Sequence, residues 1–89
     1  MLQRTLEALC DPTRREIMKL LRKNPKSSGE IAEKFDISAP AISRHLSVLR
    51  EAELVIAHRE GKSVIYSLSP ESLELVADWL DDFLKEIYS

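Results

Sequence analysis

The chain has 89 residues and a formal net charge of −2, with 44% hydrophobic and 31% charged residues, a composition typical of one small globular domain, so we expect a single domain over residues 1–89. Its apolar runs are far shorter than the roughly twenty residues of a membrane span, and its N-terminus lacks the apolar segment of a signal peptide. We therefore expect a cytosolic protein with no membrane insertion.

Charge is distributed unevenly along the chain. Residues 1–69 hold twelve Lys and Arg against nine Asp and Glu, whereas residues 70–89 hold one Lys against six acids. Because the local field governs the approach of phosphate, the first segment is compatible with nucleic-acid binding despite the negative total. The alternative is that both segments form ordinary solvated surfaces and that their charges differ only by chance.

Two helices are predicted at the start of the chain. Asp11 and Pro12 indicate the beginning of the second helix, since Asp accepts hydrogen bonds from free N–H groups and Pro fits the first helical position. This helix is expected to run to about Lys23 and to stop before Pro25. Three leucines at helical spacing predict the short first helix: Leu2, Leu6 and Leu9.

Two further helices are predicted across a short turn. Ser27, with Glu30 three residues on, has the pattern of a capping box and predicts a third helix over about residues 28–35. Ser38 is expected to cap a fourth helix over about 39–52, and Pro40 is tolerated in its first turn. One apolar stripe of the fourth helix is expected to face the core: Ile42, Leu46 and Leu49.

A hairpin and a last helix complete the pattern. Two strand-like runs, 54–59 and 63–68, flank a tip at residues 60–62, and Ser69 with Pro70 predicts the cap of a final helix. The expected fold is mainly α (α+β): a winged helix-turn-helix of five helices with a two-stranded β-hairpin wing, in the order ααααββα.

In this layout the fourth helix enters the major groove of DNA. Arg44 is predicted to project away from the core stripe, and it is the best candidate for a bidentate contact to guanine, worth about 1–3 kcal/mol of discrimination. His45 borders the stripe, so it either reaches DNA or packs within the protomer. Arg59 and Lys62 are candidates for phosphate or minor-groove contacts, although charged hairpin tips are common and Glu60 weakens this patch. The full predicted DNA-binding set is Ser38, Ala39, Pro40, Ala41, Ser43, Arg44, His45, Ser47, Arg59 and Lys62.

The last helix has more apolar surface than one core face requires. We expect one strip to cover the domain's own core and a second, together with the first helix, to bind a second copy of the chain. A single thick core face is the alternative. Two-fold symmetry would place two recognition helices about one DNA turn apart, near 34 Å. The predicted dimer interface is Leu2, Leu6, Leu9, Val76, Trp79, Leu80, Phe83, Leu84 and Ile87.

Five sequence motifs follow one another in a characteristic order and spacing: Asp11-Pro12-Thr13-Arg14-Arg15, then residues 29–32, 37–46, 49–52 and 59–68. Together they resemble the ArsR/SmtB family of bacterial winged-helix repressors, and the resemblance runs from about residue 3 to the end. It implies a homodimer on double-stranded DNA, a recognition helix in the major groove and repression by blocking a promoter.

Many relatives in that family release DNA on binding a metal, through cysteines on the third helix or through Asp and His on paired last helices. Here the third helix has no cysteine, and the last has Asp78, Asp81 and Asp82 but no histidine. Carboxylates alone are poor ligands for zinc-like metals, so we expect no metal and no other cofactor. Within that family the chain resembles the short, sensorless autorepressors of toxin-immunity operons, and this resemblance implies that a regulatory protein partner relieves repression.

Two questions stay open at this stage. Cys10, the only cysteine, is either a redox switch or an inert core filler. The rival function is a winged helix used for protein contacts, with the DNA surface idle. An enzyme is not expected, because two histidines with no paired nucleophile and no glycine-rich phosphate loop offer no catalytic machinery.

Overall fold

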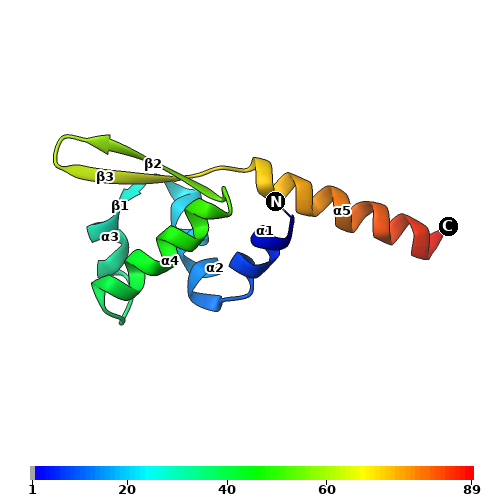
Figure 1. Cartoon of the computed structure of the whole chain (residues 1–89), viewed down its shortest axis with the longest axis horizontal. Helices are drawn as coiled ribbons and strands as arrows, with labels where there is room; N and C mark the ends of the chain where they lie inside the picture. Colours follow the sequence, from blue (N-terminus) through cyan, green and yellow to red (C-terminus); the bar gives the residue numbers. More distant parts are fainter. Residues whose placement is uncertain (1) are drawn as a thin grey trace.

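The structure is a computed structural model that describes residues 2–89. It confirms the predicted winged helix-turn-helix, with five helices in the expected order (Figure 1). The elements are α1 (Leu2–Leu9), α2 (Pro12–Lys23), β1 (Lys26–Ser27), α3 (Ser28–Glu33), α4 (Ala39–Glu51), β2 (Val55–Glu60), β3 (Ser63–Leu68) and α5 (Glu71–Tyr88).

The sheet has one strand more than the predicted hairpin. Strands β2 and β3 pair antiparallel as expected, and the short strand β1 adds to the other side of β3, giving the order β1-β3-β2. Lys26 pairs with Tyr66 and Ser27 with Ile65. Since β1 runs directly into α3, this pairing joins the middle of β3 to the helix-turn-helix.

Three of the four predicted helix caps are confirmed. The Asp11 carboxylate accepts from the backbone N–H of Thr13 and Arg14, and Ser27 with Glu30 forms the reciprocal capping box. The Ser38 hydroxyl accepts from the Ala41 N–H at 3.3 Å. Each such cap stabilises a helix by about 1 kcal/mol.

The predicted cap of the last helix is wrong. No side chain caps α5, and its N-cap position is occupied by Pro70 in an αR conformation. The backbone N–H of Ser69 donates instead to the Leu54 carbonyl at 2.9 Å. This bond extends the contact between the ends of β2 and β3 and fixes where α5 begins.

A left-handed residue ends α4 and turns the chain into the wing. Glu53 has φ 58°, while its N–H donates to the Arg50 carbonyl and the Leu54 N–H donates to the Leu49 carbonyl, both at 2.9 Å. These two bonds are those of a Schellman motif, in which the left-handed position favours glycine. A glutamate there carries some backbone strain.

The core lies among α1–α4 and the start of β2. The predicted inward stripe of α4 is confirmed, since its three members are at most 1% exposed. Ser72, at the start of α5, is also buried, and its hydroxyl donates to the Ala52 carbonyl at 3.1 Å. The cluster consists of Ala8, Ile17, Met18, Leu21, Ile31, Ile42, Leu46, Leu49, Ala52, Leu54 and Val55.

The protomer is elongated, with extents of 52 × 25 × 21 Å. The wing and the helix-turn-helix lie at one end of the long axis, and the C-terminal part of α5 projects from the other (Figure 1). The first half of α5 contacts α1, but every residue from 77 to 89 is exposed. Among residues 2–89, no helix is both long and apolar enough to cross a membrane.

Candidate nucleic-acid interface

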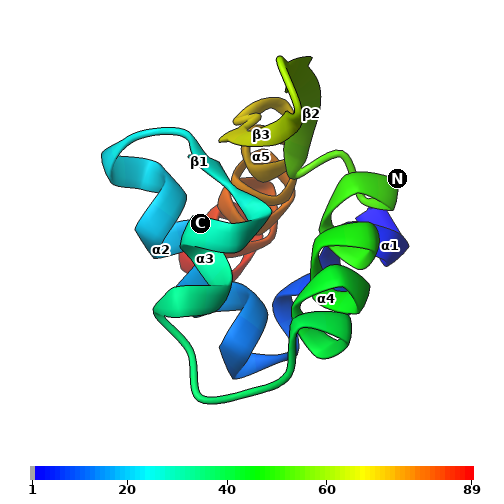
Figure 2. The ribbon, with the colours of Figure 1, turned by 90° about the vertical axis from the view of Figure 1, so that its left-hand side faces the viewer.

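The end of the molecule opposite the C-terminus presents the helix-turn-helix and the wing together. Figure 2 views the molecule from this end and shows α3 and α4 below the β2–β3 hairpin, with α5 receding behind them. Helices α3 and α4 are in contact, and α4 also contacts β2. The predicted recognition helix and wing therefore belong to one rigid unit that is held by the common core.

The predicted DNA-reading face of α4 is accessible. Small and polar side chains occupy its start, and most of the predicted residues are exposed: Ser38, Ala39, Pro40, Ser43, Arg44 and Ser47. Ala41 and His45 are half-buried. Because the core stripe is almost fully buried on the opposite side, the exposed face keeps a fixed orientation relative to the domain.

Arg44 lies where the helical wheel predicts, on the exposed side of α4. No other side chain among residues 2–89 forms a hydrogen bond or ion pair with its guanidinium. A planar guanidinium with free donors can pair with the O6 and N7 acceptors of guanine. The geometry therefore leaves Arg44 available for a base or phosphate.

His45 packs against the protomer. Its Nδ1 lies 3.3 Å from Nη1 of Arg14, a residue of α2. The same Arg14 side chain donates from Nε to the Ala8 carbonyl at 2.7 Å and from Nη2 to the Glu7 carbonyl at 3.0 Å. Of the two interpretations open for His45, the packed one accounts for this side of the ring.

Arg14 is a residue that the sequence reasoning missed. It stands in the quoted stretch 11–15, but no spacing rule predicts that the start of α2 contacts both the end of α1 and α4. The neighbouring Arg15 donates to the Leu9 carbonyl at 2.6 Å. Two arginines thus satisfy the last carbonyls of α1, where the helix dipole favours positive charge.

Asp11 lies beside this cluster. Desolvation opposes ionisation of its carboxyl, but the backbone N–H groups of Arg14 and Thr13 outweigh it and hold the pKa below the ordinary value of 3.8. The positive charge of the Arg14 guanidinium acts in the same direction. The cap of α2 is therefore ionised and intact at neutral pH.

The wing tip carries its two predicted cations on exposed positions. Arg59 and Lys62 are both exposed, and Gly61 adopts φ 63°, the left-handed value that a two-residue hairpin turn needs at its first position. Glu60, which was expected to weaken this patch, has Oε2 3.4 Å from Nε2 of His58. The Glu60 carboxylate therefore lies beside the His58 ring of the same wing.

The acidic residues of α5 are separated from this end. Glu71 and Glu74 lie in the first turn of α5, and the other four acids lie along the projecting part: Asp78, Asp81, Asp82 and Glu86. Figure 1 places that part at the opposite end of the long axis from the wing tip. The remainder of the chain, residues 1–69, carries twelve Lys and Arg against nine Asp and Glu.

The predicted dimer residues divide into three groups by their burial. Val76 is only 7% exposed, and Leu9 packs against the protomer's core, so these two contribute chiefly to the chain's own packing. Leu2 is half-buried. The remaining six lie on the surface, with exposures between 36% and 59%: Leu6, Trp79, Leu80, Phe83, Leu84 and Ile87. The rings of Trp79 and Phe83 pack against each other with centroids 5.7 Å apart.

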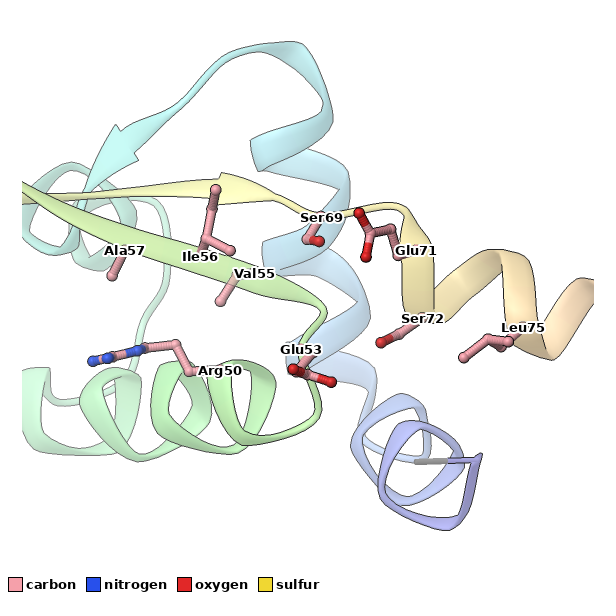
Figure 3. Close-up of a pocket in the computed structure, with 9 residues that line it drawn as sticks. All are labelled: Arg50, Glu53, Val55, Ile56, Ala57, Ser69, Glu71, Ser72 and Leu75. Atoms are coloured by element: carbon pink, nitrogen blue, oxygen red, sulfur yellow. The ribbon is translucent and has the colours of Figure 1, made fainter.

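A crevice of about 590 Å³ lies between the end of α4, strand β2 and the start of α5 (Figure 3). Its charged lining residues are Arg50, Glu53 and Glu71. Figure 3 shows their side chains directed to different sides, so they do not converge on one bound molecule. Within residues 2–89, no group of three His, Cys, Asp or Glu is arranged to hold a metal ion.

Cys10 is exposed and not part of the core. The interpretation of this residue as a core filler is therefore wrong, because the chain places it between α1 and α2 at the surface.

Comparison with known proteins agrees with this architecture. A model of bacterial regulatory proteins of the arsR family matches residues 11–57. The chain is 41% identical over 80 residues to the transcriptional repressor SdpR of Bacillus subtilis (strain 168), a match that covers 90% of this chain and 89% of that protein.

Solved structures give the same result. A crystal structure of the ArsR family transcriptional regulator RHA00566 is similar with a TM-score of 0.93 and 27% identity, over 99% of this chain and 91% of that one. The homodimeric winged helix-turn-helix DNA-binding domain Mb0332 of Mycobacterium bovis, solved by NMR, is similar with a TM-score of 0.74 and 27% identity, over 94% and 82% of the two chains.

Proposed function

Because the chain belongs to the arsR family of bacterial regulatory proteins, we propose that it is a transcriptional repressor that binds an inverted-repeat operator as a homodimer. In this proposal residues 1–89 act as one DNA-binding domain. The chain is similar along most of its length to the repressor SdpR, and this similarity supports repression over activation.

One observation carries the proposal: the exposed face of α4 and the exposed apolar face of α5 lie at opposite ends of the same rigid protomer (Figure 1). Arg44 is free on the first face, while Trp79 and Phe83 stand exposed on the second. A second copy that covers the α5 face would leave both recognition helices at the outer parts of the assembly. Two such helices one DNA turn apart read an inverted repeat.

Each predicted contact has a distinct role in this proposal. Arg44 and the small residues at the start of α4 read base edges, because they allow the helix end to approach the groove closely. Arg59 and Lys62 contact phosphates beside the wing. His45 takes part only from the side of its ring that Arg14 leaves open.

Regulation follows from the same surfaces. We propose repression of the chain's own gene, in the cytosol where a DNA-binding regulator acts, with relief by a protein partner and without a metal. Saturating zinc, nickel, cobalt or arsenite should leave the DNA affinity unchanged in a gel-shift assay. A tenfold loss with any of these ions would contradict that part of the proposal.

The experiment is footprinting of the purified chain on the DNA upstream of its own gene, followed by affinity measurements over a range of salt concentrations. We expect a protected inverted repeat and an affinity that falls steeply with salt, since phosphate contacts release counterions. Arg44→Ala should cost about 1–3 kcal/mol on the protected site and relax its sequence preference.

Lys62→Ala is the matched control. It should weaken binding nearly equally on all sequences and reduce the salt slope by about one. A chain that shows no salt-dependent binding to this DNA would favour the rival function, a winged helix for protein contacts.

A further inference from the structure

Arg14 joins three helices through one side chain. It belongs to the first turn of α2, and its guanidinium donates to two C-terminal carbonyls of α1, those of Glu7 and Ala8. Its third nitrogen, Nη1, faces Nδ1 of His45 on α4 at 3.3 Å. One planar group therefore links the element that packs on α5 to the helix that carries the DNA-reading face.

The contact also determines how His45 holds its proton. A guanidinium has donors and no acceptor, so the Nδ1 that faces it must be unprotonated. A neutral imidazole with a free Nδ1 carries its proton on Nε2. His45 is therefore left with one N–H donor, on the ring nitrogen that Arg14 does not contact.

We propose that Arg14 is a positioning residue for DNA binding: it fixes α4 relative to the dimer-forming helices and orients His45 so that its Nε2–H donates to the DNA backbone. The inference rests on the proposed function. Neutral N–H donors contact phosphate oxygens in many protein–DNA interfaces and fix the register of the reading helix.

Arg15 provides a control within the same turn. It donates to the Leu9 carbonyl at 2.6 Å and so also satisfies the end of α1, but no hydrogen bond or ion pair within residues 2–89 joins its side chain to α4. A role limited to capping α1 would make Arg14 and Arg15 equivalent. A positioning role requires that only Arg14 is coupled to His45.

The test is a double-mutant cycle on the full chain, with the duplex protected in the footprint as probe. Arg14→Lys keeps the positive charge at the end of α1 but loses the fork that reaches three acceptors, and His45→Ala removes the ring. We expect each single variant to weaken DNA binding about tenfold. The double variant should also lose about tenfold, not a hundredfold, because both substitutions remove the same contact between Arg14 and His45. In the cycle of Arg15→Lys with His45→Ala, the losses of DNA affinity of the two single variants should multiply.

A conservative replacement separates positioning from folding. His45→Asn places an amide oxygen close to the position of Nδ1, where Arg14 can donate to it. It should recover part of the affinity that His45→Ala loses, but only when Arg14 is present. Thermal unfolding and sedimentation of all variants check that the fold and the dimer are retained.

The tautomer of His45 is a readout independent of DNA. In ¹H–¹⁵N spectra of the imidazole we expect the Nε2–H form in the wild-type chain and in Arg15→Lys, and a mixture of forms in Arg14→Lys. Multiplicative losses in the Arg14 cycle, or a tautomer that Arg14→Lys does not change, would overturn the inference. A wild-type chain that fails to bind the duplex would instead remove the proposed function, and the spectra would still decide whether Arg14 holds the ring.

Discussion

The two ends of the protomer differ in how fully a single chain buries their apolar side chains. Leu46, on α4, is 1% exposed within the common core, whereas Leu84, on α5, is 45% exposed. The helix-turn-helix end has its apolar stripe buried, three helices capped by side chains and no unpartnered buried side-chain polar atom among residues 2–89. The projecting part of α5 has an exposed aromatic pair and no covering element. One end is completed within a single chain, and we propose that the other is completed by a second copy.

The largest expected effect is a loss of stability at the helix-turn-helix end. Leu46→Ala removes buried methyl groups in a rigid core and should lower the free energy of unfolding by about 2–5 kcal/mol, a large part of the stability of a small domain. Urea denaturation measures the loss, which should be similar at low and high protein concentration. A loss below 1 kcal/mol would show that the core around Leu46 is loosely packed.

The next effect concerns the incomplete end. Phe83→Ala should raise the dissociation constant of the dimer by about 30-fold or more, as expected for an aromatic residue at an interface hot spot. Sedimentation at several concentrations measures the change, and Asp78→Ala, on the polar side of α5, is the control. Dimers that persist unchanged in Phe83→Ala would mean that another surface joins the two chains.

A smaller effect of pH is expected at the helix caps. Desolvation raises the pKa of Asp11, but the backbone N–H groups of Arg14 and Thr13 lower it more, so the folded value lies below the ordinary 3.8. A lowered pKa stabilises the fold fully above pH 3.8, and this contribution is lost as the pH falls below 3.8 through the folded value. Asp11→Asn keeps a side-chain cap but cannot ionise, so thermal unfolding of this variant should depend less on pH below 4. An unchanged acid dependence would assign the loss to other groups.

Local signals account for most of the fold that the sequence predicts. The caps at Asp11, Ser27 and Ser38 were predictable because each depends on residues two or three positions apart. The stripe of α4 was predictable from its period. Strand β1 was not, because Lys26 and Ser27 are a strand only through partners about forty residues along the chain. Ser69 had the composition of a cap, but a tertiary bond to Leu54 decides its role.

The site was predictable to the same degree and for the same reason. The exposure of Arg44 follows from the helical period, and the structure agrees. The contact between Arg14 and His45 joins residues 31 positions apart and depends on how α1, α2 and α4 meet. Val76 was assigned to the dimer because its spacing matches the apolar strip, yet it is buried in the protomer. Periodicity identifies an apolar face but not which neighbour covers it.

The most direct test of the two-ended account changes the DNA and leaves the protein unaltered. Inserting about five base pairs, half a helical turn, between the two halves of the protected repeat rotates one half-site to the opposite side of the duplex. If two recognition helices are held at a fixed spacing by the paired α5 ends, the affinity of the dimer should fall to that of a single half-site. An affinity that is unchanged by the insertion would contradict the account, because it would mean that each chain binds DNA independently of the other.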